Sequence, residues 1–194
     1  MDISRLKGQE HIKRALEIAT TGNHSMLVMC ISCYDDGINF LWPIAQTLNI
    51  STNIRTPCPC GNFGSAERTC TCSDQLRDRF YAETMPVMPV HHDMYLEMHA
   101  VSYEKLTSDR ASEPHETVME RITRAKAHLP KVSIALDAAG QSLMKAAVRQ
   151  LAFSQWQYEQ TLNVAHTISA LAGAKAIGAA HIAEAVQYRP RASA

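Results

Sequence analysis

Four cysteines crowd into one short segment, and this crowding constrains the chain more than any other feature of its sequence. Their spacing is C-x-C, nine residues, C-x-C, formed by Cys58, Cys60, Cys70 and Cys72. In a reducing compartment such a cluster is more typical of a metal site than of disulfides. Zinc prefers a tetrahedron of thiolates, which two pairs on tight turns would supply. We therefore predict a closed structural zinc site. A catalytic metal site and a loop of free thiols are the alternatives, because C-x-C is less diagnostic than C-x-x-C.

The other two cysteines, Cys30 and Cys33, form a C-x-x-C pair. They follow the apolar run Met26–Met29, which predicts a buried strand. A C-x-x-C pair can be redox-active or can be half of a metal site. It can also be two small buried apolar side chains, and no second cysteine pair lies nearby in the sequence.

The composition indicates a globular protein without bulk electrostatic attraction for nucleic acid. Of 194 residues, 46% are hydrophobic and 20% are charged, and the 19 basic residues balance the 19 acidic ones. A formal net charge of zero gives only weak support to DNA binding and none to an anionic membrane partner. The apolar run Met26–Ile31 is far shorter than a membrane span, and the first residues lack the order of a signal peptide. We expect a cytoplasmic protein.

Hydrophobic spacing predicts an α+β chain. A strand is expected over Met26–Ile31, a turn over Tyr34–Gly37, a helix over Phe40–Leu48 capped by Asn39, and a strand over Tyr95–Val101. Helices are also expected over 9–21, 73–81, 114–129 and from Asp137 onward, including one opened by the S-x-x-Q capping box at Ser154 and one over 179–188. The predicted core of the C-terminal bundle comprises Leu162, Ile168, Leu171, Ile182 and Val186.

Four segments also carry a family resemblance. They are Asp2–Glu10, the cysteine loop from Thr56 to Cys72, Asn163–Gly173 and Ile177–Arg189. Together they resemble the magnesium-chelatase-like AAA+ ATPases, and within that family the competence-associated helicases that drive DNA branch migration. The resemblance implies ATP binding, DNA processing and assembly into rings. It divides the chain into a truncated αβ core (1–55), a four-cysteine zinc-type loop (56–80), a short strand-containing connector (81–112) and a C-terminal helical lid (113–194).

The nucleotide machinery of that family is missing from the sequence. A P-loop reads G-x-x-x-x-G-K-[ST], and Asp36 falls where its lysine would stand if the segments align without gaps. No apolar strand ends in paired acids, and His91 and His166 stand where the family carries arginines. A neutral imidazole replaces a bidentate guanidinium poorly. We therefore expect an internally truncated pseudoenzyme with no ATPase activity, no catalytic residue and no bound ATP.

Two functions remain in view. The first is a non-hydrolysing, zinc-stabilised structural or interaction module, whose partner is an intact AAA+ relative or a second copy of the chain. The alternative is an ATP-binding subunit of a branch-migration motor, as in intact relatives. Two further alternatives are a hydrolytic enzyme built on a zinc site and a decaying gene product with no selected function. His115-Glu116 lacks the second histidine of H-E-x-x-H, so the zinc hydrolase has little support.

Overall fold

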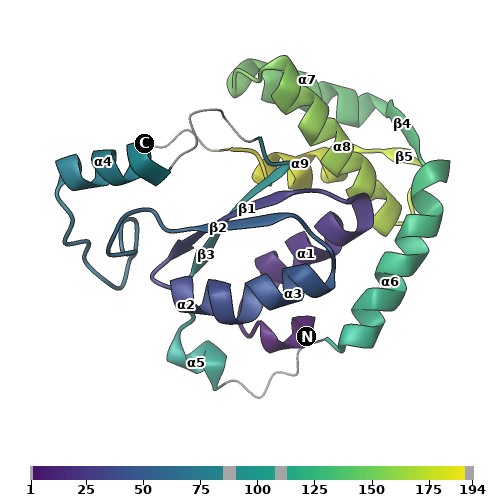
Figure 1. The fold of residues 1–194 in the computed structure, drawn as a ribbon. Helices are drawn as coiled ribbons and strands as arrows, with labels where there is room; N and C mark the ends of the chain where they lie inside the picture. Colours follow the sequence, from purple (N-terminus) through teal and green to yellow (C-terminus); the bar gives the residue numbers. More distant parts are fainter. Residues whose placement is uncertain (1, 85–90, 108–112, 191–194) are drawn as a thin grey trace. The chain divides into compact units, whose positions relative to one another are not determined.

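The computed structural model describes residues 2–84, 91–107 and 113–190. These residues form two compact units (Figure 1), one within Met1–Lys13 and Ser25–Ser112 and the other within Arg14–His24 and Glu113–Ala194. Helices and small parallel sheets make up both units, so the fold is α+β as predicted. In the part of the chain just given, no helix is long and apolar enough to cross a membrane.

A three-stranded parallel sheet organises the first unit. β1 (Met26–Ile31) lies between β2 (Thr52–Arg55) and β3 (Met94–His99). Both predicted strands are therefore confirmed, whereas β2, which pairs with β1 on its other side, was not predicted. The other elements of this unit are η1 (Ile3–Arg5), the start of α1 (Glu10–Gly22), α2 (Tyr34–Asp36), η2 (Gly37–Leu41), α3 (Trp42–Thr47), α4 (Asp74–Thr84) and α5 (Tyr103–Leu106).

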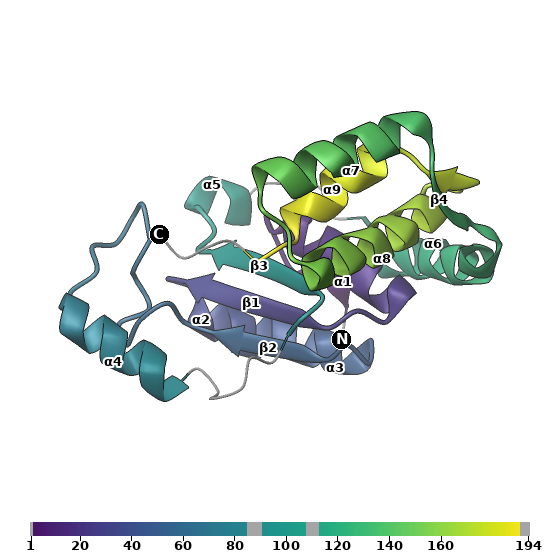
Figure 2. The same cartoon turned by 90° about the horizontal axis from the view of Figure 1, so that it is seen from above.

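The chain turns directly from β1 into a helix that runs along one face of the sheet (Figure 2). The predicted turn over Tyr34–Gly37 and the predicted Asn39 cap are both wrong. Helical hydrogen bonding begins already at Cys33, whose carbonyl accepts from the Gly37 amide at 3.0 Å. Gly37 signals close packing rather than a turn, because a Cβ there would lie 2.6 Å from the Cys30 sulfur.

The second unit is a helical bundle with a small two-stranded ribbon. The Ser154 capping box is confirmed, since the Ser154 hydroxyl accepts from the Gln157 amide and the Gln157 side chain accepts from the Ser154 amide. The ribbon of two parallel strands was not predicted. Besides residues 14–22 of α1, the elements are α6 (His115–His128), η3 (Leu129–Lys131), β4 (Ser133–Leu136), α7 (Ala138–Gln150), α8 (Gln155–Leu171), β5 (Ala176–Ile177) and α9 (Ala179–Gln187).

The predicted core of the bundle is only partly correct. Ile168 and Ile182 are buried, whereas Leu162, Leu171 and Val186 are half-buried. The fully enclosed side of α8 consists largely of small and β-branched side chains. Small side chains let neighbouring helices approach closely, which moves the longer leucines to the edge of the contact.

An ion-pair cluster within the second unit ties α1, α6 and α9 together. The Glu17 carboxylate is only 4% exposed and accepts from the guanidinium groups of Arg14, at 2.9 Å, and Arg121. Arg14 also pairs with Glu184 of α9 at 2.8 Å, and Arg121 pairs with Glu113 at 2.8 Å. A buried carboxylate is stable only when it is paired in this way.

Replacing Glu17 with Gln should destabilise the protein by about 1–3 kcal/mol, because two partly buried guanidinium groups lose their charged acceptor. The matched change Glu10→Gln, on the same helix, should cost less than about 0.5 kcal/mol, because Glu10 is 78% exposed in its pair with Lys13. Urea unfolding measures both losses. Equal losses for the two variants would contradict a structural role for the Glu17 cluster.

Candidate metal centre

The cysteine loop is attached to the carboxyl end of β1. Ser32, the residue that follows β1, donates its amide to the Gly61 carbonyl at 2.9 Å and its hydroxyl to the Asn62 side-chain oxygen at 2.8 Å. Gly61 and Gly64 have positive φ values of 75° and 84°, which glycine adopts without strain. These contacts fix the turn that carries Cys58 and Cys60 against the sheet.

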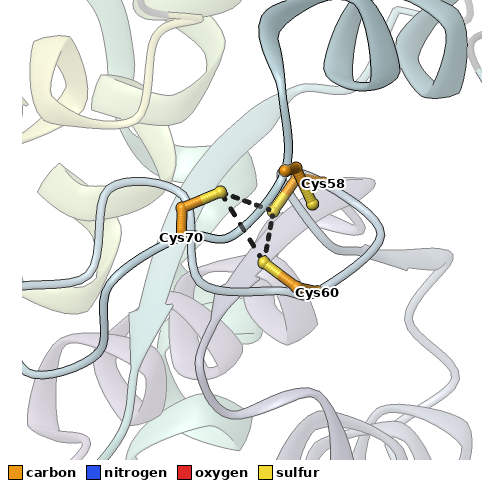
Figure 3. A group of neighbouring side chains, drawn as sticks. Cys58, Cys60 and Cys70 are labelled. Atoms are coloured by element: carbon orange, nitrogen blue, oxygen red, sulfur yellow. Dashed lines mark hydrogen bonds between the residues drawn. The ribbon is translucent and has the colours of Figure 1, made fainter.

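The four loop cysteines converge on one point, and Figure 3 shows Cys58, Cys60 and Cys70. The Cys58 sulfur lies 3.4 Å from that of Cys60 and 3.7 Å from that of Cys70, and the Cys60 and Cys70 sulfurs are 3.6 Å apart. With Cys72 included, all four sulfurs lie within 4.8 Å of one another. The structure therefore brings together the four residues that the spacing singles out, and the group could hold a metal ion.

The sulfur spacing fits tetrahedral coordination. A metal–sulfur bond of about 2.3 Å in a regular tetrahedron separates neighbouring sulfurs by about 3.8 Å. The three separations among Cys58, Cys60 and Cys70 fall slightly below this value, so these three sulfurs need only small outward shifts to hold a metal ion between them. All six cysteines are free thiols, and disulfides do not compete for these four sulfurs in the structure.

Backbone amides point at the sulfurs, as they do where thiolate charge must be stabilised. The Phe63 amide donates to the Cys58 sulfur at 3.4 Å. Amides of Asn62 and Thr71 donate to Cys60, and these bonds lower the pKa of Cys60 to about 5. A thiolate is therefore favoured at one position before any metal binds.

The second pair of cysteines titrates in the opposite direction. The Cys60 amide donates to the Cys72 sulfur, but desolvation and hydrogen bonds with the Cys60 and Cys58 thiols outweigh it and raise the pKa of Cys72 to about 11. The pKa of Cys70 is also raised, since desolvation and the same two thiols outweigh the Cys72 amide. A metal ion that binds here must displace these protons, so its affinity should fall as the pH falls.

An arginine clamps the loop from α4, which sequence reasoning missed. The Arg77 guanidinium lies 4.2 Å from the centre of the Phe63 ring and donates to the Cys72 carbonyl at 3.1 Å. Arg77 also pairs with Asp74, one turn earlier in α4. One side chain thus contacts both halves of the cysteine loop, and no motif in the sequence signals this long-range contact.

Cys30 and Cys33 lie outside the four-sulfur cluster, and neither is brought into it. Among the residues that the structure describes, no other group of three or more cysteine, histidine or acidic side chains could hold a metal ion. His91 is exposed, and the His166 ring hydrogen-bonds with the Val132 carbonyl at 3.1 Å. Asp36 lies in the first turn of α2, where the resemblance places a P-loop lysine.

Comparison with known families gives one match. Residues 105–189 match the family described as magnesium chelatase, subunit ChlI C-terminal. This segment holds α6 to α9, and the match supports the magnesium-chelatase-like family. No curated protein matches the chain.

Cobalt(II) provides a direct test of the four-sulfur geometry. The wild-type chain should bind one cobalt ion with the intense visible bands of a tetrahedral thiolate complex. Cys70→Ser should weaken binding by more than about 100-fold, since changes outside the ligand shell alone cost about 10–100-fold. Cys33→Ser is the matched control, because a hydroxyl can still donate to the Met98 carbonyl that Cys33 contacts. Equal spectra for both variants would rule out Cys70 as a ligand.

Proposed function

We propose that the chain is a non-hydrolysing relative of the magnesium-chelatase-like ATPases, whose zinc-bound loop serves as a structural and protein-interaction module. The observation that carries the proposal is the turn after β1. A P-loop directs backbone amides at phosphate from this place. Here the Ser32 amide donates to the Gly61 carbonyl, and the cysteine loop stands where a triphosphate would need open amides.

Charge at this turn supports the same conclusion. Only Ser32 and Cys33 separate β1 from α2. This two-residue connection is too short for the eight-residue loop that holds phosphate in a P-loop. The first turn of the helix then carries Asp35 and Asp36. Two carboxylates at this position repel phosphate, and phosphoryl transfer depends almost entirely on positioning and charge neutralisation.

Zinc is the metal that the donor set favours. Four thiolates on two short turns suit the tetrahedral, closed sites in which zinc has a structural role. Cys58 is the only buried residue between Thr56 and Thr84. A loop with so little core gains its folding free energy from the bound ion, which can contribute on the order of 10 kcal/mol.

The α4 surface supports a role in protein contact. None of the side chains of α4 is buried, and Leu76 and Tyr81 are 45% and 52% exposed. Phe63 of the cysteine loop is 41% exposed beside this helix. Helices of this length are marginal in water without tertiary packing, so a partner that covers α4 would stabilise it. Apolar side chains on a chain of zero net charge fit protein contact better than DNA contact. The partner that we propose is an intact relative from the same family.

One preparation of the chain tests the metal and the nucleotide together. Metal analysis should find about one zinc per chain, and iron in its place would contradict the zinc assignment. Thermal unfolding of this material should not change on addition of Mg-ATP. Ligand at 100 times its Kd would stabilise the protein by about 2.7 kcal/mol, so a rise of several degrees in Tm would favour the motor subunit instead.

The interaction role predicts different effects for two neighbouring changes on α4. Leu76→Glu should weaken association with the purified full-length relative by about tenfold or more, because it places a charge in the apolar contact. Gln75→Glu adds the same charge at an exposed neighbouring position and should change affinity by less than about threefold. Sedimentation of the mixed proteins measures both affinities. If the wild-type chain does not associate, or if both variants associate equally, α4 is not the contact.

A further inference from the structure

The C-x-x-C pair at the end of β1 takes no part in the metal centre. Cys30 is fully buried and Cys33 is 5% exposed, and both are free thiols. Cys30 belongs to β1, whereas Cys33 precedes α2. Neither of them belongs to the four-sulfur cluster.

The fold places the two thiols beside each other. Cys30 pairs with Met98 in the register of β1 and β3. The Cys33 thiol donates to the carbonyl of that same Met98 at 3.0 Å, so it lies next to the Cys30 position on the sheet. Ser32, between the two cysteines, has a positive φ of 57°, which turns the chain back on itself. The two thiols are close enough for each to shift the pKa of the other.

Close packing by a glycine leaves space for the Cys30 sulfur. A Cβ at Gly37 would lie 2.6 Å from this sulfur, so any larger residue would displace it. The sulfur is thereby held between the sheet and the helix that starts after Cys33. A cysteine that directly precedes a helix and lies beside a second thiol is placed for thiol–disulfide exchange.

We propose that Cys30 and Cys33 form a reversible intramolecular disulfide, with a low-molecular-weight disulfide such as oxidised glutathione as the oxidant. Cys33 is the attacking residue because it is the more exposed of the two. Interaction with the Cys30 thiol also lowers the pKa of Cys33, whereas interaction with Cys33 and burial raise the pKa of Cys30.

The exchange balances in two steps. The Cys33 thiolate attacks one sulfur of the oxidant, a mixed disulfide forms, and the first glutathione leaves as a thiolate. Cys30 then loses its proton to solvent and attacks the Cys33 sulfur, which releases the second glutathione. Two electrons pass from the protein to the oxidant, and two protons pass to the released glutathione. The Cys33 thiol no longer donates to the Met98 carbonyl in the oxidised form.

The sequence allows a clean test on the full metal-loaded chain. Trypsin cleaves after Arg14 and Arg55, so Cys30 and Cys33 share one peptide, 15–55. The loop cysteines fall in the separate peptides 56–68 and 69–77. The native protein is incubated with oxidised glutathione, free thiols are blocked with N-ethylmaleimide in denaturant, and the digest is analysed without reduction.

Peptide 15–55 should carry no N-ethylmaleimide and should be lighter by two hydrogens than its reduced form. Treatment with a reducing phosphine before blocking should restore two N-ethylmaleimide labels on this peptide. Cys30→Ser should stop at the glutathione adduct on Cys33. Several results would overturn the proposal. They are two labels on the oxidant-treated wild-type peptide, a glutathione adduct alone on the wild type, a disulfide to either loop peptide, or oxidation of 15–55 only after the protein has been unfolded.

Discussion

Convergence of four sulfur atoms gives the first unit a segment that apolar packing alone would not maintain. From Thr56 to Thr84 only Cys58 is buried, and α4 has no enclosed side chain. Two hydrogen bonds from Ser32 attach the segment to the end of β1, the Arg55 guanidinium donates to the Thr84 carbonyl at 2.7 Å, and Arg77 stacks on Phe63 within the segment. Such polar contacts contribute only about 1 kcal/mol each, so we expect the four-sulfur cluster to supply much of the order. Small folded segments elsewhere depend on metals for the same reason.

The attachment also changes what the end of β1 can do. In a parallel sheet the carboxyl ends of the strands form the usual ligand-binding edge, because helix N-termini and loop amides meet there. In this chain the Ser32 amide already donates to the Gly61 carbonyl. The buried thiols of Cys30 and Cys33 flank Ser32 in the sequence. The edge is filled by the protein's own loop. Our proposal of a non-hydrolysing module and our proposal of a redox pair both start from this replacement.

Local signals in the sequence predict those elements that depend on their own residues. The strand Met26–Ile31, the capping box at Ser154 and the grouping of the four loop cysteines are all present. Short strands are different, since β2 and the two-residue β5 exist only through pairing with distant segments. The turn predicted at Gly37 is wrong for the same reason, because this glycine is needed for close packing against Cys30. The Arg77 clamp joins segments whose proximity no local pattern encodes.

The composition of the second unit has a practical consequence for anyone who wishes to produce it separately. The segment similar to the magnesium chelatase family begins at residue 105, yet three of its side chains depend on the end of α1. Arg121 needs Glu17, Glu184 needs Arg14, and Thr167 is bonded to the His24 ring at 2.8 Å. A fragment cut at the limits of sequence similarity would lack Arg14, Glu17 and His24, and Arg121 would keep Glu113 but lose the buried Glu17. Grafting residues 14–24 onto it, by circular permutation or as an added peptide, is what such a fragment requires.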